Sequence, residues 1–143
     1  MHKGHYKVSS YKNYRATLLV GIVLIIPLGY GVRFSTSLGM PLLQDIVGSL
    51  AYQILLMFLV AFFYHRTSLA KIAVGVFVAS SVGELLQLWQ PPLLQTIRAT
   101  WIGRIILGNT FTLSDFSPYA VGSFLGWLGL RWLRRKMVHP FAA

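Results

Sequence analysis

Long apolar stretches alternate with short polar segments along most of the chain. The stretches cover residues 16–32, 42–64, 69–89 and 115–132. A helix needs about 20 apolar residues to cross the roughly 30 Å hydrocarbon core of a bilayer. Each stretch is near that length, although the first is short. The pattern therefore predicts four transmembrane helices.

The segment between the third and fourth stretches has a different pattern. Residues 93–108 follow Pro91 and Pro92 and are mostly apolar, but they include Arg98 and Arg104. Two arginines in so short a run disfavour a fifth span, which is the alternative, and favour a short interfacial or re-entrant segment. A continuous helix here would place four residues on one face: Leu94, Arg98, Trp101 and Ile105.

The first stretch follows a cationic segment, as the apolar part of a signal peptide would. Arg33 and Phe34 come after it instead of a small-x-small cleavage site, so we expect a retained signal anchor. The predicted fold class is all-α integral membrane. A single domain over residues 1–143 forms a compact bundle of four transmembrane helices, with the short segment before the last.

Composition excludes several other classes of protein. The chain is 55% hydrophobic and 11% charged, whereas about a quarter of the residues in soluble domains are charged. A net charge of +10 raises the possibility of nucleic-acid binding, but the bases lie between apolar runs rather than along a basic stripe. The chain has no cysteine, and its four histidines share no ligand spacing. We therefore expect no nucleic acid, metal or cofactor.

The basic residues are divided unequally between the two sides of the predicted bundle. One side carries the two termini and the turn after the second span, with ten bases: Lys3, Lys7, Lys12, Arg15, Arg66, Lys71, Arg131, Arg134, Arg135 and Lys136. The other side carries Arg33, Arg98 and Arg104. Because short cytoplasmic loops are enriched in lysine and arginine, we expect both termini in the cytoplasm.

All three acidic residues are predicted at the outer face. Asp45 and Asp115 begin the second and fourth spans, where helix capping or compensation of the helix dipole explains them as well as a function does. Glu84 lies inside an apolar run, where an acid needs a buried partner or a task. Pairing with Arg98 or Arg33 is the structural explanation.

Helical spacing places further polar and small residues beside these acids. Ser80, Glu84 and Gln87 share one face of the third span. On the fourth span a stripe joins Asp115, Tyr119, Gly122, Gly126 and Gly129. Glycines four residues apart allow close helix contact, so we expect the fourth span to pack centrally.

These residues resemble a known family. The resemblance covers roughly residues 33–127 and rests on Glu84-x-x-Gln87, Arg98, Leu107-Gly108, Phe111, Asp115, Tyr119 and Gly122. The pattern is similar to the family of small bacterial membrane proteins known as domain of unknown function 2809, and more distantly to the VanZ-like group. One departure is Gln44, which stands where the family often has glycine before the acid. The resemblance implies a bundle of four or five helices in the bacterial plasma membrane and work on the cell envelope.

Three functions remain open from the sequence. The leading hypothesis is a non-enzymatic envelope accessory protein that binds a lipid or glycolipid headgroup at its outer face. The candidate residues are Glu84, Gln87, Arg98, Asp115, Asp45, Arg33 and Tyr119. The alternatives are a membrane enzyme that acts on a lipid-linked substrate through Glu84 and Asp115, and a proton-coupled transporter. The oligomeric state is open, a homo-oligomer included.

Overall fold

The computed structural model describes residues 3–35, 39–107 and 113–138. Within these ranges the chain is helical and has no strand, which confirms the predicted all-α class. The elements are α1 (Lys3–Phe34), α2 (Pro41–Phe63), α3 (Leu69–Leu86), α4 (Pro92–Ala99), α5 (Trp101–Leu107), the 3-10 turn η2 (Leu113–Asp115) and α6 (Phe116–Val138).

Three of the described helices are long and apolar enough to cross a membrane. These spans are Ser10–Val32 in α1, all of α2 and all of α3. Only 11%, 28% and 17% of their most apolar windows is buried inside the protein, so most of their apolar side chains face outward. α6 has 23 residues, the same length as α2, but falls outside this set. Its four basic residues, Arg131, Arg134, Arg135 and Lys136, together with its glycine, serine and tyrosine residues, make it less apolar.

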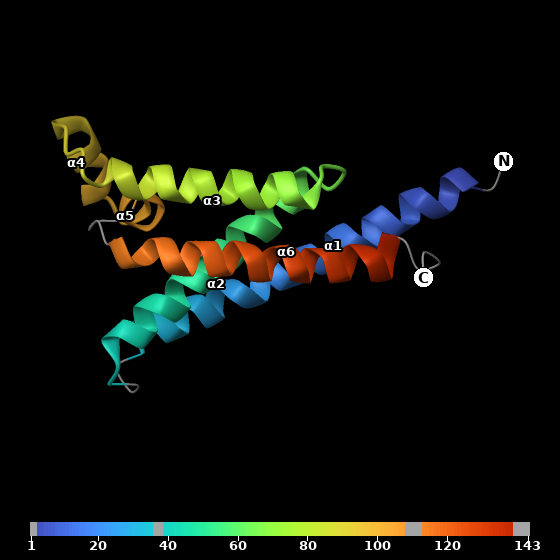
Figure 1. Cartoon of the computed structure of the whole chain (residues 1–143), viewed down its shortest axis with the longest axis horizontal. Coiled ribbons are helices and arrows are strands. Elements are labelled where there is room, and N and C mark those ends of the chain that lie inside the picture. Colours follow the sequence, from blue (N-terminus) through green and yellow to red (C-terminus); the bar gives the residue numbers. More distant parts are fainter. Residues whose placement is uncertain (1–2, 36–38, 108–112, 139–143) are drawn as a thin grey trace.

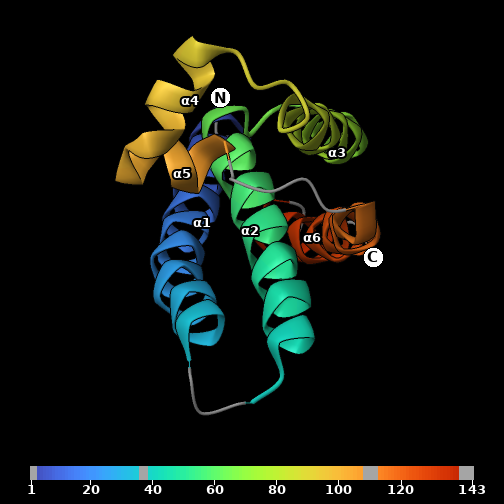
Figure 2. The ribbon, with the colours of Figure 1, turned by 90° about the vertical axis from the view of Figure 1, so that its left-hand side faces the viewer.

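The helices form two antiparallel pairs that cross each other. α3 and α6 run side by side, and α1 and α2 cross them diagonally (Figure 1). α6 packs against α1, α2 and α3, which is the central position predicted for the last span. The start of α1, the α2–α3 turn and the end of α6 lie at one end of the bundle (Figure 1). The end of α1, the start of α2, α4 and α5 lie at the other end, which faces the viewer in Figure 2.

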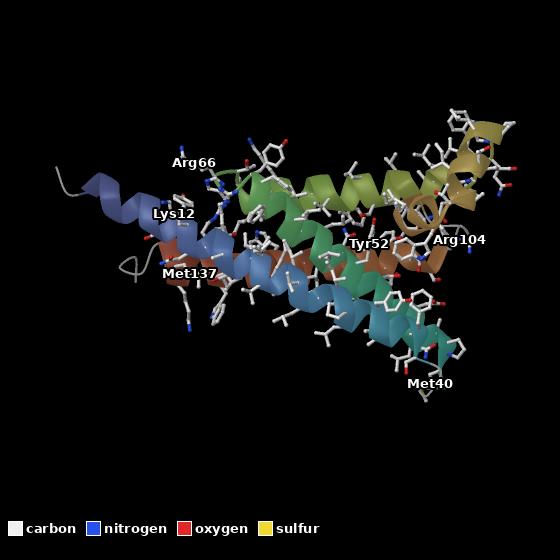
Figure 3. All side chains as sticks on the ribbon, turned by 180° about the vertical axis from the view of Figure 1, so that it is seen from behind. Lys12, Met40, Tyr52, Arg66, Arg104 and Met137 are labelled. Carbon is white, nitrogen blue, oxygen red and sulfur yellow. The ribbon has the colours of Figure 1, made fainter. Side chains whose placement is uncertain are left out.

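The two halves of the interior differ in chemistry. The apolar core lies toward the end that carries the termini and includes Tyr14, Leu18, Met57, Ala61 and Leu130. The residues buried toward the other end include polar ones, namely Gln53, Glu84, Gln87, Arg98 and Ser123. We call the end with the start of α1 and the end of α6 the basic end, after the lysines and arginines of its helices, and we call the opposite end the polar end. In Figure 3, Lys12 and Arg66 mark the basic end, and Met40 and Arg104 mark the polar end.

Residues 92–107 form two short helices, so the continuous helix that would have placed residues 94, 98, 101 and 105 on one face is not formed. Thr100 has an extended backbone, with φ −76° and ψ 149°, and interrupts the helix. Its hydroxyl oxygen accepts a hydrogen bond from the Gly103 N–H at 3.0 Å, which caps the start of α5. With eight and seven residues, α4 and α5 are each about 12 Å long or less at 1.5 Å per residue. Neither can cross a bilayer.

A glycine makes the tight elbow between these helices possible. A Cβ atom at Gly103 would overlap the backbone carbonyl of Ile97. The start of the pair is set by proline, because Pro92 occupies the first turn of α4, where its missing N–H costs no hydrogen bond. α3 therefore ends at Leu86, and the chain turns across the polar end.

Candidate functional site

Glu84 lies inside the polar end, between α3 and α6. Its side chain is 2% exposed. One carboxylate oxygen, Oε2, accepts a hydrogen bond from Gln87 Nε2 at 3.1 Å and another from the Tyr119 hydroxyl at 3.1 Å. Gln87 lies one turn farther along the chain, and Tyr119 belongs to α6. The carboxylate therefore links the two helices through a buried polar contact.

Arg98 has a different role from the predicted pairing with Glu84. Its guanidinium donates to the backbone carbonyl of Leu86 at 2.8 Å through Nη2 and to that of Trp89 at 3.3 Å through Nη1. The last carbonyls of a helix have no partners within the helix, and a cation is favourable at this end of the helix dipole. Arg98 thus caps the C-terminal end of α3 and attaches α4 to it.

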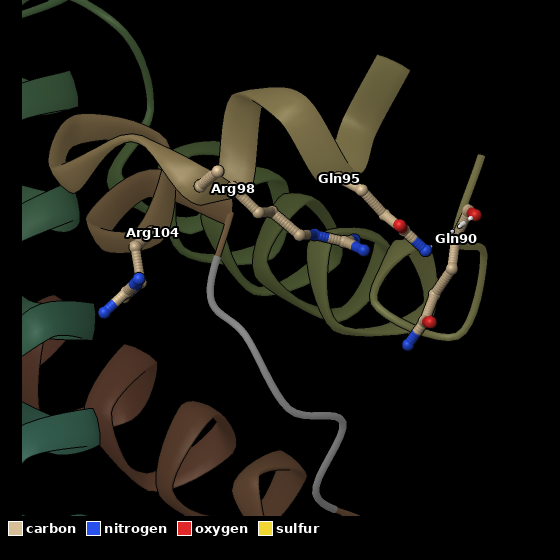
Figure 4. Close-up of a pocket in the computed structure, with 5 residues that line it drawn as sticks. Gln90, Gln95, Arg98 and Arg104 are labelled. Carbon is tan, nitrogen blue, oxygen red and sulfur yellow. Dashed lines mark hydrogen bonds between the residues drawn. The ribbon is translucent and has the colours of Figure 1, made fainter. Parts of the chain in front are cut away.

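A cavity of about 370 Å³ opens beside Arg98. It is lined by Gln90, Gln95, Arg98, Ala99 and Arg104. Figure 4 shows the Arg98 side chain extending toward Gln90 and Gln95, whereas the Arg104 side chain extends from α5 in the opposite direction. Arg98 Nε is buried and has no hydrogen-bond partner. Among the described residues, the lining comprises two arginines, two glutamines and one alanine, with no carboxylate.

The three acidic residues share one end of the bundle but do not form one cluster. Asp115 is half-buried directly before α6, and its charge acts on the Tyr119 phenol. Asp45 is exposed and lies beyond the first turn of α2, so compensation of the helix dipole in that turn does not explain it. The start of α2 lies apart from the end of α3 in Figures 1 and 2. The structure thus brings together Glu84, Gln87, Tyr119 and Asp115, with Asp45 separate.

Part of the predicted site falls outside the described residues. Arg33 lies in the last turn of α1, but its side chain is not described, and the side chain of Leu107 is not described either. Gly108 and Phe111, which carry part of the family resemblance, lie in the segment 108–112, outside the described ranges. Within the described residues, no three histidine, aspartate or glutamate side chains gather as metal ligands do.

Sequence reasoning missed a second buried polar network, which is centred on Gln53. Gln53 on α2 is fully buried. Its Nε2 donates to the Ser123 hydroxyl oxygen at 2.8 Å, and its Oε1 accepts from the Ser80 hydroxyl at 2.7 Å. These bonds join α2, α3 and α6. The signal was present, because an amide in the middle of an apolar span needs hydrogen-bond partners when it is buried.

The glycine stripe of α6 makes close contact with α2 over part of its length. A Cβ atom at Gly122 would lie 2.8 Å from Gln53 Cβ, and one at Gly126 would lie 3.0 Å from Met57 Cγ. A Cβ atom at Gly129 would meet no atom within 4 Å. The close helix approach therefore involves Gly122 and Gly126, and Gly129 lies outside it.

Fold and site together define a class: a small all-helical protein with helices apolar enough to cross a membrane and a polar interior at one end. The family described as Protein of unknown function (DUF2809) has a model that matches residues 39–123, more than half of the chain. The chain belongs to this family. No curated protein and no solved structure matches the chain. The matched region contains both polar networks and every residue that lines the cavity.

Proposed function

We propose that this protein binds the phosphate-bearing headgroup of a lipid or glycolipid in the cavity at its polar end, as an accessory protein of the bacterial cell envelope. The observation that carries the proposal is the cavity lining, in which Arg98 and Arg104 have no carboxylate beside them. A guanidinium matches a phosphate group through paired N–H donors. Gln90 and Gln95 add amide groups that can bond glycerol or sugar hydroxyls.

The surroundings of the cavity suit the interface between bilayer and water. Several large apolar side chains around it are strongly exposed: Trp89, Leu93, Trp101, Ile102 and Ile106. Tryptophan is enriched at the depth of lipid headgroups, where its ring is partly in hydrocarbon and partly in water. In this arrangement α4 and α5 lie in the interface, and a headgroup reaches Arg104 without leaving the membrane surface.

The proposal includes a four-span topology with both termini in the cytoplasm. α6 is about 34 Å long at 1.5 Å per residue and runs antiparallel beside α3, so it crosses the membrane with α3. Gly122, Ser123 and Gly126 lower its hydropathy, but these residues are buried against its neighbours and do not meet lipid. The ten bases gather at the basic end, the charge bias of a cytoplasmic face. The cavity then opens at the outer face of the plasma membrane.

Arg104 is the best residue for testing the cavity, because it is exposed and has no capping role like that of Arg98. The full-length protein in detergent micelles is titrated with dioctanoyl phosphatidylglycerol and followed by microscale thermophoresis. We expect Arg104→Gln to weaken binding about tenfold, since hydrogen bonds to charged groups contribute about 1.5–3 kcal/mol. Arg135→Gln makes the same charge change at an exposed position of the basic end and serves as the matched control.

Two further ligands show whether a lipid is bound. Dioctanoyl phosphatidylcholine tests the need for net negative charge, and inorganic phosphate tests whether the phosphate group alone is enough. Equal affinities of wild type and Arg104→Gln would refute the proposal. Inorganic phosphate binding as tightly as the lipid would show a phosphate site instead of a lipid site.

The enzyme and transporter hypotheses have no comparable support. Both depend on Glu84, whose carboxylate accepts hydrogen bonds from Gln87 and Tyr119 between α3 and α6. The described residues that line the cavity are Gln90, Gln95, Arg98, Ala99 and Arg104, which favour binding of an anion.

A further inference from the structure

A second hollow lies between α3 and α6, near the middle of the bundle, and Ser123 of the Gln53 network is among its lining residues. It is a groove of about 380 Å³ with an apolar exposed surface. Its lining includes Ala70, Ala73 and Phe77 from α3, and Ala120, Phe124 and Trp127 from α6. The three alanines leave space between the helices, and the aromatic rings supply apolar surface. The groove shares no residue with the cavity at the polar end.

The groove faces away from the interior of the bundle, toward the surrounding bilayer. Gly122 and Gly126 turn the other side of α6 toward α2. In the groove itself, Phe124 is strongly exposed, and so is Val74, which also lines it. A hydrocarbon chain can therefore enter from the side.

A positive charge marks the end of the groove nearest the basic end. Arg131 is one helical turn beyond Trp127, is exposed, and its guanidinium carbon lies 5.0 Å from the centre of the Trp127 ring. Arg134, on the same side of the helix, donates to the carbonyls of Thr67 at 3.0 Å and His65 at 2.5 Å. These bonds hold the α2–α3 turn, and with it the start of α3, against α6. All three acids of the chain lie at the other end.

We propose that this groove binds one acyl chain of an anionic phospholipid, whose phosphate group lies against Arg131. A phospholipid has both the apolar chain that the groove fits and the negative charge that its end attracts. The phosphate end of the site, at Arg131, lies toward the basic end and away from the headgroup cavity, and the site does not depend on the function proposed for that cavity.

A second copy of the chain fits the groove less well. The groove follows residues 70–77 and 120–127, which is about 10 Å along each helix. A volume of about 380 Å³ over that length gives a mean cross-section of about 38 Å² (380/10), roughly half that of an α-helix about 10 Å across with its side chains. A parallel partner would also bring its own basic end beside Arg131, where like charges repel.

Fluorescence quenching by brominated lipids tests the proposal directly, because Trp127 lines the groove. A variant that keeps Trp127, with Trp89, Trp101 and Trp132 replaced by phenylalanine, is placed in vesicles. The vesicles contain graded fractions of phosphatidylglycerol or phosphatidylcholine brominated at the middle of the chain. We expect phosphatidylglycerol to quench Trp127 at about fivefold lower mole fraction than phosphatidylcholine, the preference that one basic residue near a membrane surface provides.

Trp132 provides a matched control on the same helix. It is exposed and also lies beneath a cation, with Lys136 Nζ 4.3 Å from its ring centre, but it does not line the groove. A variant that keeps Trp132 alone should show a smaller preference for phosphatidylglycerol than Trp127 does, because no groove holds the lipid chain beside Trp132. Trp127 and Trp132 lie at different depths in the membrane. Because the two lipids are compared at the same tryptophan each time, this difference in depth does not affect the preference that is measured. Arg131→Gln should bring the phosphatidylglycerol curve of Trp127 onto its phosphatidylcholine curve while quenching by both continues.

Two results would overturn the inference. If Trp127 shows no more preference for phosphatidylglycerol than Trp132 does, the groove is ordinary lipid-facing surface. If Trp127 is protected from both lipids and chemical cross-linking yields dimers, a second copy occupies the groove. Circular dichroism of each variant verifies that its helices are formed. Arg104→Gln should leave the Trp127 curves unchanged, so this test and that of the headgroup cavity fail independently.

Discussion

The contact between α6 and α2 can be tested with one substitution at two positions of the same helix. An added Cβ atom at Gly122 would lie 2.8 Å from Gln53 Cβ, 3.1 Å from Gln53 Cγ and 3.4 Å from the Leu50 carbonyl oxygen. At Gly129 the same atom would meet nothing within 4 Å. The change in helix propensity is the same at both positions, so the difference in stability reports the packing.

The expected energies have opposite signs. Replacing glycine by alanine inside a helix favours the helix by about 0.8–1 kcal/mol, and Gly129→Ala should increase the free energy of unfolding by up to that amount. Gly122→Ala also adds a methyl group to a filled space, and such overpacking typically costs about 1–3 kcal/mol. Gln53 cannot easily move aside, because Ser80 and Ser123 both hold its amide. We therefore expect a net loss of up to about 2 kcal/mol for Gly122→Ala.

The measurement is unfolding of the full-length protein in mixed micelles with increasing sodium dodecyl sulfate, followed by circular dichroism. Gly122→Ala should unfold at a lower detergent fraction than wild type, and Gly129→Ala at a higher one. Equal shifts for the two variants would refute the close contact of α6 with α2. A Gly122→Ala variant that is more stable than wild type would refute it as well.

Three further predictions concern the two ends of the bundle. Arg134→Gln should reduce the free energy of unfolding by about 1.5–3 kcal/mol, because charged hydrogen bonds to the α2–α3 turn are lost; Arg135→Gln, at an exposed position, should leave it nearly unchanged in the same assay. Burial, followed by the nearby charge of Arg15, lowers the pKa of His65 below its usual 6.5. The unfolded chain therefore takes up the proton first, so stability should fall as the pH drops below about 6.5, and His65→Gln should flatten this part of a pH titration of stability. Gly103→Ala should disrupt the α4–α5 elbow, because the methyl group overlaps the Ile97 carbonyl; faster proteolysis between α3 and α6 reports the disruption, and cleavage at the wild-type rate would contradict it.

Local pattern predicted the helices well. The apolar runs of the first three stretches coincide with α1, α2 and α3, since the length and composition of a run decide by themselves whether a helix can cross hydrocarbon. The position of Glu84 inside such a run correctly predicted that it would be buried. For residues 93–108 the pattern favoured a short segment over a fifth span, and the structure has two short helices in place of one continuous helix. Thr100 interrupts the helix there, and the elbow depends on the contact of Gly103 with Ile97.

The partners of the polar residues were beyond the reach of local pattern. Glu84 and Tyr119 are 35 residues apart, and Gln53 and Ser123 are 70 apart. Which residues meet across such separations depends on how α2, α3 and α6 cross. Arg98 illustrates the difficulty. Its sequence neighbourhood contains both Glu84 and the backbone carbonyls that follow it, and the arginine bonds to the carbonyls of Leu86 and Trp89.

The sequence alone determined the apolar helices, the separation of ten bases from three acids, and which residues share the polar face of α3. Composition and helical period decide these features, and both are local properties of a chain. Tertiary structure alone decided which polar groups pair, that Asp45 lies apart from Glu84, and where the cavity and the groove lie. These depend on the crossing of helix pairs, which brings together residues that no local period relates. The two hollows proposed as lipid sites arise in this way, at the end of α3 and along its contact with α6.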